Sequence, residues 1–204
     1  MSEPIRLLLA DDQALVRGAL SALLGRERDL EVVAEVERGD EVVEAAIANS
    51  VDVALLDVEM PGMDGIEVAR DLKALAPNVR SLIVTTFGRP GYLQRALDAG
   101  ASGFVVKDTP ASELADAVRR VHQGLRVVDP ALATESLIEG SNPLTDREQE
   151  ALRLVLDGRP VSQVADQMSL STGTVRNHLS NAAAKTAGES SVQAAVIARD
   201  RGWL

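Results

Sequence analysis

Residues that can do chemistry follow four strand-like runs in the first 107 residues of the chain. The run before Asp57, Val53–Leu56, is short and continuously apolar, as in a strand buried on both faces of a parallel sheet. The polar residues at the carboxyl ends of these runs are Asp11 and Asp12, Asp57, Thr85 and Thr86, and Lys107. Because open α/β sheets place their ligands at this end of the strands, we expect these side chains to form one site.

The set favours phosphoryl chemistry. Three carboxylates at one edge repel each other and raise the pKa of at least one of them unless a cation neutralises them. Oxygen ligands on an open, hydrated edge suit Mg²⁺, which keeps waters and binds phosphate oxygens. Lys107 adds a positive charge, and a threonine hydroxyl can donate to an incoming oxyanion. This combination suits transfer of a phosphoryl group to Asp57. Each residue alone would pass for a strand-end turn former, so the argument depends on their joint placement.

The elements that must position these residues alternate regularly. Strand patterns are expected at Ile5–Ala10, Glu31–Val36, Val53–Leu56, Val79–Thr85 and Ser102–Val106. Helix patterns follow at Ala14–Leu24, Gly39–Asn49, Gly65–Ala76, Pro90–Ala99 and Pro110–Gly124. Five such pairs predict an α/β fold with a doubly wound, five-stranded parallel sheet and helices on both faces.

The pattern changes after residue 124. Leu125–Pro143 contains two prolines and a Gly-Ser-Asn cluster, which is typical of a linker, with a short helix expected over Pro130–Ile138. Four helix patterns follow, and the two in the middle are joined by a tight turn, as in a helix-turn-helix. Their first residues or caps are expected at Thr145, Val161, Thr172 and Ser190. We expect a first domain over residues 1–124, a linker over 125–142 and a small all-α domain over 143–204.

Composition and charge limit the kinds of partner and the cellular location that we expect for this chain. The net charge of −10 argues against non-specific nucleic-acid binding by the whole chain. Residues 1–141 contain 14 basic and 24 acidic residues, whereas residues 142–204 contain seven of each. The two parts are therefore expected to have different partners. Cysteine is absent, which excludes disulfides and thiol chemistry. We find no membrane span and no signal-peptide pattern, so a soluble cytoplasmic protein is expected.

Three motifs of the first domain resemble the receiver domain of two-component response regulators. They are Leu9–Gln13, Leu56–Gly65 and Ala99–Lys107. The resemblance covers about residues 4–124 and implies a flavodoxin-like receiver. It implies that Asp57 is the phosphoacceptor and that a sensor histidine kinase supplies the phosphoryl group from a phosphohistidine.

The same resemblance implies roles for the neighbours of Asp57. Asp12 and Asp57 would ligate Mg²⁺ directly, Asp11 would act largely through water, and the main-chain carbonyl of Glu59 would complete the protein ligands. Thr85 and Phe104 match the switch pair of the family. Phe104 lacks the hydroxyl of the tyrosine that is frequent there, so its switching would depend on packing, and it is alternatively a simple core residue.

Three motifs of the second domain resemble the LuxR-type helix-turn-helix. They are Leu144–Glu148, Val164–Met168 and Ser171–Leu179. With the receiver they resemble a NarL/FixJ-type response regulator, and Thr85–Ala96 with Gly202–Leu204 look most like its DesR-type branch. The resemblance implies a transcription regulator whose phosphorylated receiver forms a homodimer through its first and fifth helices, about Ala14–Leu24 and Ala111–Gln123, and binds operator DNA. The apolar residues of both helices are equally explained by burial against the sheet.

Contacts with DNA are expected from the third helix of this domain. Arg176 can read a guanine or hold a phosphate, and Asn177 can pair with adenine. The full expected set is Thr172, Thr174, Arg176, Asn177, Ser180 and Lys185. The resemblance also shows a departure: the family usually carries more basic residues on this helix and just after it, where this chain has Ser180, Asn181, Glu189, Ser190 and Ser191. Fewer phosphate contacts predict weaker binding that depends on dimerisation.

Two other functions deserve comparison with a regulator that is not an enzyme. An Asp-nucleophile phosphatase would need a second acid two residues after the nucleophile, and Glu59 occupies that position. The Asp11-Asp12 pair, Lys107 and the helix-turn-helix favour the receiver instead. A phosphorylation-switched protein that no longer contacts DNA is a second alternative, which the missing basic residues support and salt-dependent DNA binding would oppose.

Overall fold

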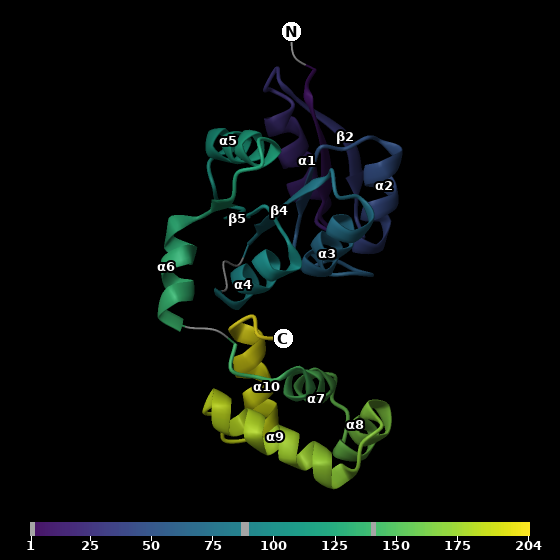
Figure 1. Ribbon diagram of the computed structural model, residues 1–204, viewed down its shortest axis with the longest axis vertical. Coiled ribbons are helices and arrows are strands. Elements are labelled where there is room, and N and C mark those ends of the chain that lie inside the picture. Colours follow the sequence, from purple (N-terminus) through teal and green to yellow (C-terminus); the bar gives the residue numbers. More distant parts are fainter. Residues whose placement is uncertain (1–2, 87–89, 140–141) are drawn as a thin grey trace. The chain divides into compact units, whose positions relative to one another are not determined.

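A parallel sheet forms the centre of the first unit of the chain in the computed structural model, which describes residues 3–86, 90–139 and 142–204 (Figure 1). Its strands are β1 (Ile5–Ala10), β2 (Leu30–Val36), β3 (Val53–Leu56), β4 (Arg80–Thr85), β5 (Gly103–Val106) and β6 (Val127–Val128). They lie in the order β2-β1-β3-β4-β5-β6, with every pair parallel. The chain therefore forms the doubly wound α/β sheet that the sequence predicts.

The sixth strand corrects the prediction of five. Val127 and Val128 pair with Gly103 and Phe104, so β6 is the outermost strand of the sheet, beside β5. A two-residue strand is too short to show the alternation by which strands are recognised in a sequence. It lies inside the segment expected to be a linker, ahead of the helix α6 (Pro130–Glu139), which was predicted. The division at residues 124 and 142 stays a prediction.

Helices cover both faces of the sheet. They are α1 (Ala14–Leu24), α2 (Val42–Ala48), α3 (Gly65–Leu75), α4 (Pro90–Ala99) and α5 (Ala111–His122), with a 3₁₀ turn over Gly39–Glu41 in place of the expected first turn of α2. Leu24 of α1 and Val118 of α5 pack in one core with alternate residues of the central strands, such as Leu7 and Leu9. The helices α2 and α3 lie over the opposite face (Figure 1). Because side chains alternate along a strand, each central strand contributes to both cores.

Four helices of the later part of the chain, which we call the second unit, pack around their own apolar core. They are α7 (Asp146–Leu156), α8 (Val161–Met168), α9 (Thr172–Thr186) and α10 (Ser191–Asp200). Leu152, Val164, Val175 and Trp203 are buried together at its centre. The capping box predicted at Thr145 is present, since Thr145 accepts from the Glu148 amide and Glu148 accepts from the Thr145 amide. No helix in the described ranges has the length and apolar character needed to cross a membrane.

The turn between α8 and α9 sets the helix-turn-helix geometry. Ser169 ends α8 in the left-handed region at φ 56°, and the Leu170 amide returns to the Ala165 carbonyl at 2.9 Å. Ser171 then caps α9 by accepting from the Thr174 amide at 3.0 Å. These two hydrogen bonds pair a free carbonyl at the end of α8 and a free amide at the start of α9, and the chain reverses within three residues. The predicted tight turn is therefore confirmed.

Candidate functional site

The polar residues predicted from the strand ends meet at the carboxyl ends of the strands, which we call the acidic edge of the sheet. Asp11 directly follows β1, Asp57 directly follows β3, and Lys107 directly follows β5, whereas Thr85 is the last residue of β4. Because all strands are parallel, their carboxyl ends lie on the same side. The sequence prediction that Asp11, Asp57 and Lys107 come together is borne out by direct contacts between them.

Lys107 lies between the two buried acids. Its Nζ is 2.7 Å from Asp11 Oδ2 and 2.9 Å from Asp57 Oδ2. The side chains of all three residues are buried, with 7% of Lys107 and 4% of each acid exposed. A pair of carboxylates removed from water needs a neutralising partner, because an uncompensated buried charge is strongly unfavourable. Lys107 supplies that charge from the carboxyl end of β5, on the same side of the sheet.

The ionisation of Asp57 and Lys107 reflects this burial. Burial raises the pKa of Asp57 above its usual range, and the nearby Asp11 adds to the rise, although Lys107 and the Val58 amide oppose it. Burial would lower the pKa of Lys107, but its hydrogen bonds to Asp11 and Asp57 outweigh burial and raise it. Lys107 therefore remains a cation. Because its single charge faces the three carboxylates of Asp11, Asp12 and Asp57, a second cation would be bound favourably here.

Three carboxylates converge so closely that one ion could contact them all. Asp11, Asp12 and Asp57 each have an oxygen atom within 4.8 Å of the others. Asp12 is exposed to solvent whereas Asp11 and Asp57 are buried. An oxygen-only donor set that is open to water on one side matches the preference of Mg²⁺ for few carboxylates and several waters. The edge therefore fits a hydrated divalent cation.

The loop after Asp57 is shaped by hydrogen bonds and by a close backbone contact. Asp57 Oδ1 accepts from the Val58 amide at 2.8 Å. A Cβ on Gly65 would lie 1.9 Å from the Asp57 carbonyl oxygen, so only glycine fits where α3 begins. Asp64 caps α3 by accepting from the Glu67 amide at 2.7 Å. The Val58 amide, the close approach of Gly65 and the Asp64 cap thus hold the backbone around Asp57.

Thr85 and Phe104 lie on the same face of the sheet. Thr85 pairs with Val106 and Phe104 pairs with Ile83, so they are diagonal neighbours on adjacent strands. Thr85 is 2% exposed and Phe104 is completely buried. The side chain of Phe104 therefore forms part of the core, and a change in its rotamer would require repacking around it. Glu59 is exposed two residues beyond Asp57.

The exposed face of α9 carries most of the residues predicted to contact DNA. Thr172, Arg176, Asn177 and Ser180 are exposed, and Thr174 is half-buried with its hydroxyl 2.8 Å from that of Ser171. Val175 and Leu179 are buried in the core, as expected. The helix therefore presents a polar surface with one arginine near its start.

Lys185 lies in a different environment from Arg176. It lies nine residues further along α9, about half a turn away around the helix. Its Nζ is 2.7 Å from Oε2 of Glu148, whose side chain is only 4% exposed. Burial would raise the pKa of Glu148, but hydrogen bonds from Lys185 and Thr145 outweigh it and hold the pKa below its ordinary value of 4.5. The capping box was visible in the sequence, whereas the pairing of its glutamate with Lys185 was not.

Arg17 is a neighbour of the acidic edge that carries no motif in the sequence. Its Nη1 donates to the carbonyl oxygen of Asp11 at 2.6 Å. Its Nη2 is 2.7 Å from Glu37 Oε1, and its Nε is 3.5 Å from Glu35 Oε2. The pairing of β1 with β2 that brings these residues together depends on strand order, which local patterns do not encode.

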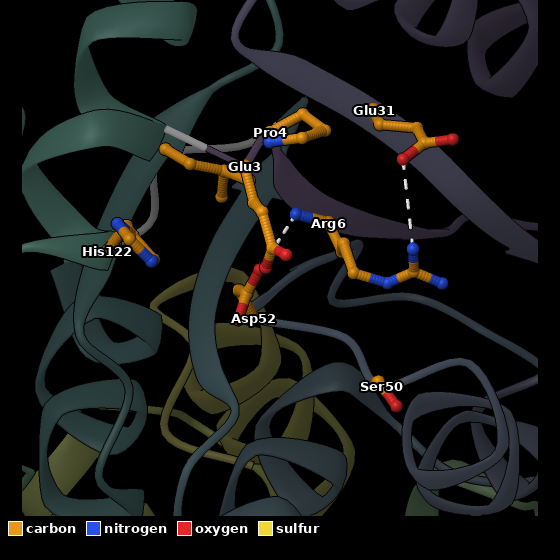
Figure 2. Close-up of a pocket in the computed structure, with 8 residues that line it drawn as sticks. Glu3, Pro4, Arg6, Glu31, Ser50, Asp52 and His122 are labelled. Carbon is orange, nitrogen blue, oxygen red and sulfur yellow. Dashed lines mark hydrogen bonds and ion pairs between the residues drawn. The ribbon is translucent and has the colours of Figure 1, made fainter. Parts of the chain in front are cut away.

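A pocket lies at the amino-terminal end of the sheet, opposite the acidic residues (Figure 2). It measures about 620 Å³ and is lined by residues that include Arg6, Glu31, Asp52 and His122. The Arg6 amide donates to Asp52 at 2.9 Å, and its guanidinium lies 3.8 Å from Glu31. None of the residues singled out as functional in the sequence lines this pocket, so we place the chemistry at the other end of the sheet.

Known proteins share both units of this chain. The family profile described as the response regulator receiver domain matches residues 7–119, and that described as bacterial regulatory proteins of the luxR family matches residues 142–198. The transcriptional regulatory protein DesR of Bacillus subtilis (strain 168) is 41% identical over 200 residues, which cover 98% of this chain and 99% of DesR. The chain thus belongs to the two-component response regulators of the NarL/FixJ type, which join a receiver to a LuxR-type helix-turn-helix.

Solved structures agree with this assignment. The response regulator ChrA of a haem-sensing two-component system is 32% identical, with a TM-score of 0.60 and full coverage of both chains. The response regulator RcsB in complex with DNA shares the fold at 23% identity, with a TM-score of 0.68 over 97% of this chain and 99% of the other. This chain is accordingly a two-component regulator of transcription, and its acidic edge is that of a receiver.

Proposed function

We propose that Asp57 accepts the phosphoryl group that switches this regulator. The observation that supports this most strongly is the contact of Lys107 with both Asp57 and Asp11 at the open end of the sheet. In the transfer, a bond forms between an Asp57 carboxylate oxygen and phosphorus. The bond from phosphorus to the donor breaks, and the donor leaves with its electron pair. We propose a sensor histidine kinase as the physiological donor, with phosphohistidine nitrogen as the leaving group.

Asp11, Asp12 and Asp57 are proposed to hold Mg²⁺, together with the Glu59 main-chain carbonyl. Bound Mg²⁺ would neutralise charge on the phosphoryl oxygens. Lys107 would supply a second positive charge to the same oxygens, since it already bridges two acids at the edge. Thr85, at the end of β4, would donate its hydroxyl to a phosphoryl oxygen, with Phe104 as its switch partner. The donor types and their placement support the roles of the acids and of Lys107. The roles of the Glu59 carbonyl, Thr85 and Phe104 are those that the resemblance to receiver domains implies.

The proposed dimer surface is formed by α1 and α5, whose exposed residues differ in character. The apolar residues of α5, such as Leu114 and Val118, are buried against the sheet, and its outer surface is polar. On α1, by contrast, Leu15 is 86% exposed and Leu23 is 39% exposed. Contact between copies would remove this apolar surface from water, which favours association. We propose that the phosphorylated receiver forms a homodimer through this surface.

Operator DNA is the proposed ligand of the second unit. The exposed Thr172, Arg176, Asn177 and Ser180 would face the DNA, with Thr174 at the start of the helix. Lys185 is proposed to support DNA binding in two ways. Its pairing with Glu148 would hold α9 against α7, and its side chain, which is 36% exposed, would also contact a phosphate. One arginine on this face gives few phosphate contacts, so two copies are needed for tight binding.

Mass spectrometry of the intact protein tests the phosphoacceptor. The wild type is incubated with Mg²⁺ and a small phosphodonor such as acetyl phosphate, beside Asp57→Asn and the control Asp40→Asn. We expect one added phosphoryl group on the wild type and on Asp40→Asn, and none on Asp57→Asn. An added phosphoryl group on Asp57→Asn would assign the chemistry to another residue.

A further inference from the structure

Arg17 spans the gap between the carboxyl ends of β1 and β2. Its side chain is only 11% exposed although it is a surface-helix residue of α1. The guanidinium is shared between the Asp11 carbonyl oxygen on one side and the Glu35 and Glu37 carboxylates on the other. The planar guanidinium carries its donors on three separate nitrogen atoms, so it reaches all three partners at once, whereas a lysine has a single nitrogen. The partly buried guanidinium therefore joins the Asp11 backbone to β2 and the residue that follows it.

The carbonyl that Arg17 contacts belongs to the peptide linking Asp11 to Asp12. Asp11 lies one residue beyond the last pair that β1 makes with β2 and β3, and its amide still donates to the Val36 carbonyl at 3.2 Å. The next peptide, between Asp11 and Asp12, lies beyond these strand pairs. Because a peptide group is planar and rigid, fixing its carbonyl also fixes the direction in which the chain reaches Asp12. The carboxyl group of Asp11 is held separately, by Lys107 and by the Gln13 amide at 3.0 Å.

We propose that Arg17 is a positioning residue that holds the Asp11–Asp12 peptide so that both carboxylates face one cation with Asp57. This inference rests on the proposed function, because it concerns the same acidic edge. Arg17 itself touches neither the phosphoryl group nor the cation. Its effect is transmitted through a backbone carbonyl, as outer hydrogen-bond partners orient the ligands of metal sites.

Removing Arg17 should change the Mg²⁺ affinity in one direction if the residue acts through its charge and in the other if it acts by positioning. If the guanidinium acted only through its charge, its removal would make this edge more negative and strengthen Mg²⁺ binding. If it acts by positioning, its removal lets the Asp11–Asp12 peptide rotate and weakens Mg²⁺ binding. Loss of an outer-sphere partner typically lowers metal affinity by about 10-fold or more. The two explanations therefore predict changes in opposite directions.

The test measures Mg²⁺ affinity by calorimetry on the unphosphorylated full-length chain. Arg17→Met is compared with the wild type and with Arg6→Met at the other end of β1. Arg6 is a matched control, since its guanidinium also donates to a backbone carbonyl, that of Asn49, and also lies near a carboxylate, that of Glu31. We expect the Mg²⁺ dissociation constant to rise about 10-fold in Arg17→Met and to stay at the wild-type value in Arg6→Met.

A second readout separates positioning from loss of structure. The yield of phosphorylated protein is titrated against Mg²⁺ with acetyl phosphate in excess. In Arg17→Met the half-saturating Mg²⁺ concentration should rise while the plateau at high Mg²⁺ stays at the wild-type level. If Arg17→Met does not fold, Arg17→Lys decides, because a single ammonium group cannot bridge all three partners and should also weaken Mg²⁺ binding.

The outcomes distinguish the two levels of the account. Unchanged or tighter Mg²⁺ binding in a folded Arg17 variant overturns the positioning role and leaves the proposed function intact. A wild type that neither binds Mg²⁺ nor takes up a phosphoryl group overturns both. Weaker Mg²⁺ binding with an unchanged plateau supports the inference.

Discussion

Lys107 Nζ lies 2.9 Å from Asp57 Oδ2, although the two residues are fifty positions apart in the sequence. The contact exists because β3 and β5 end at the same edge of the sheet with only β4 between them. It gives the buried Asp57 a fixed positive neighbour whose own pKa is raised by the same contact and by Asp11. Lys107 therefore fixes the position of the Asp57 carboxylate beside that of Asp11.

Replacing Lys107 should destabilise the receiver in a pH-dependent way. Lys107→Met leaves Asp11 and Asp57 buried without a neutralising partner, which should lower the free energy of unfolding by about 3–5 kcal/mol at neutral pH. Burial already raises the pKa of Asp57, and loss of the lysine raises it further. When the pKa of an acid is higher in the folded than in the unfolded state, the folded state binds the proton more tightly. The free energy of unfolding of Lys107→Met should therefore fall as the pH rises above 3.8, the ordinary pKa of the group.

The measurement is chemical unfolding of Lys107→Met at neutral and at mildly acidic pH. The deficit relative to the wild type should shrink at acidic pH, where the two carboxyl groups can hold protons. Lys73→Met is the control, since Lys73 is exposed on α3. A deficit that is the same at both pH values would argue against an electrostatic origin.

Substitution of Gly65 should disturb the backbone on which Asp57 lies. The Cβ of Gly65→Ala would collide with the Asp57 carbonyl oxygen, so the loop must move and both stability and phosphorylation should fall. Gly18→Ala is the matched control for stability, because a Cβ there meets nothing within 4 Å. In a helix that change is expected to stabilise by up to about 1 kcal/mol. Thermal unfolding of both variants gives the comparison, and equal melting temperatures would contradict the close contact.

The pair of Glu148 and Lys185 should make the second unit sensitive to acid. The pKa of Glu148 is held below 4.5, so its stabilising contribution is present above that value and is lost as the pH falls through the folded pKa. Glu148→Gln should lower the free energy of unfolding by about 1–3 kcal/mol at neutral pH, because a charge-assisted hydrogen bond is lost. The difference from the wild type should vanish in strong acid.

Circular dichroism during thermal unfolding provides this comparison. Glu150→Gln removes a carboxylate from the same helix, where it forms an exposed pair with Arg147, and should have little effect. A Glu148→Gln variant as stable as the wild type at neutral pH would mean that the buried pair contributes nothing.

Arg176 should account for much of the electrostatic contribution of α9 to DNA binding. Arg176→Ala is expected to weaken binding of the phosphorylated protein to a promoter fragment and to lower the salt-dependence slope by about one unit per subunit. Arg147→Ala, on the exposed side of α7, serves as the control. Binding is followed by fluorescence anisotropy at several salt concentrations, and an unchanged slope would remove Arg176 from the interface.

The first unit was largely predictable because its signals are local. Continuous apolar strands ending in Asp57 or Lys107, with glycines at the turns, indicate a parallel sheet and its functional edge without knowledge of contacts. Strand β6 was missed because two valines show no periodicity. The bridging contacts of Arg17 were missed because they depend on β2 lying beside β1, which is a property of strand order.

In the second unit, helix positions were readable but their partners were not. The predicted capping residues Thr145 and Ser190 mark helix starts, and both caps are present, while the cap of α9 by Ser171 is seen only in the structure. Lys185 was predicted to contact DNA from its charge and its place on α9, and that prediction stays open. Its pairing with a buried glutamate of α7 depends on how the helices pack, which residue spacing alone does not determine.

The central claim is that phosphorylation of Asp57 drives pairing of receivers, and light scattering after size-exclusion chromatography tests it most directly. The molar mass of the wild type is measured before and after treatment with Mg²⁺ and acetyl phosphate, beside Asp57→Asn and Leu15→Glu, which places a charge on the exposed surface of α1. We predict a shift from monomer to dimer for the treated wild type and for neither variant. A dimer that forms equally in treated Asp57→Asn would contradict the account.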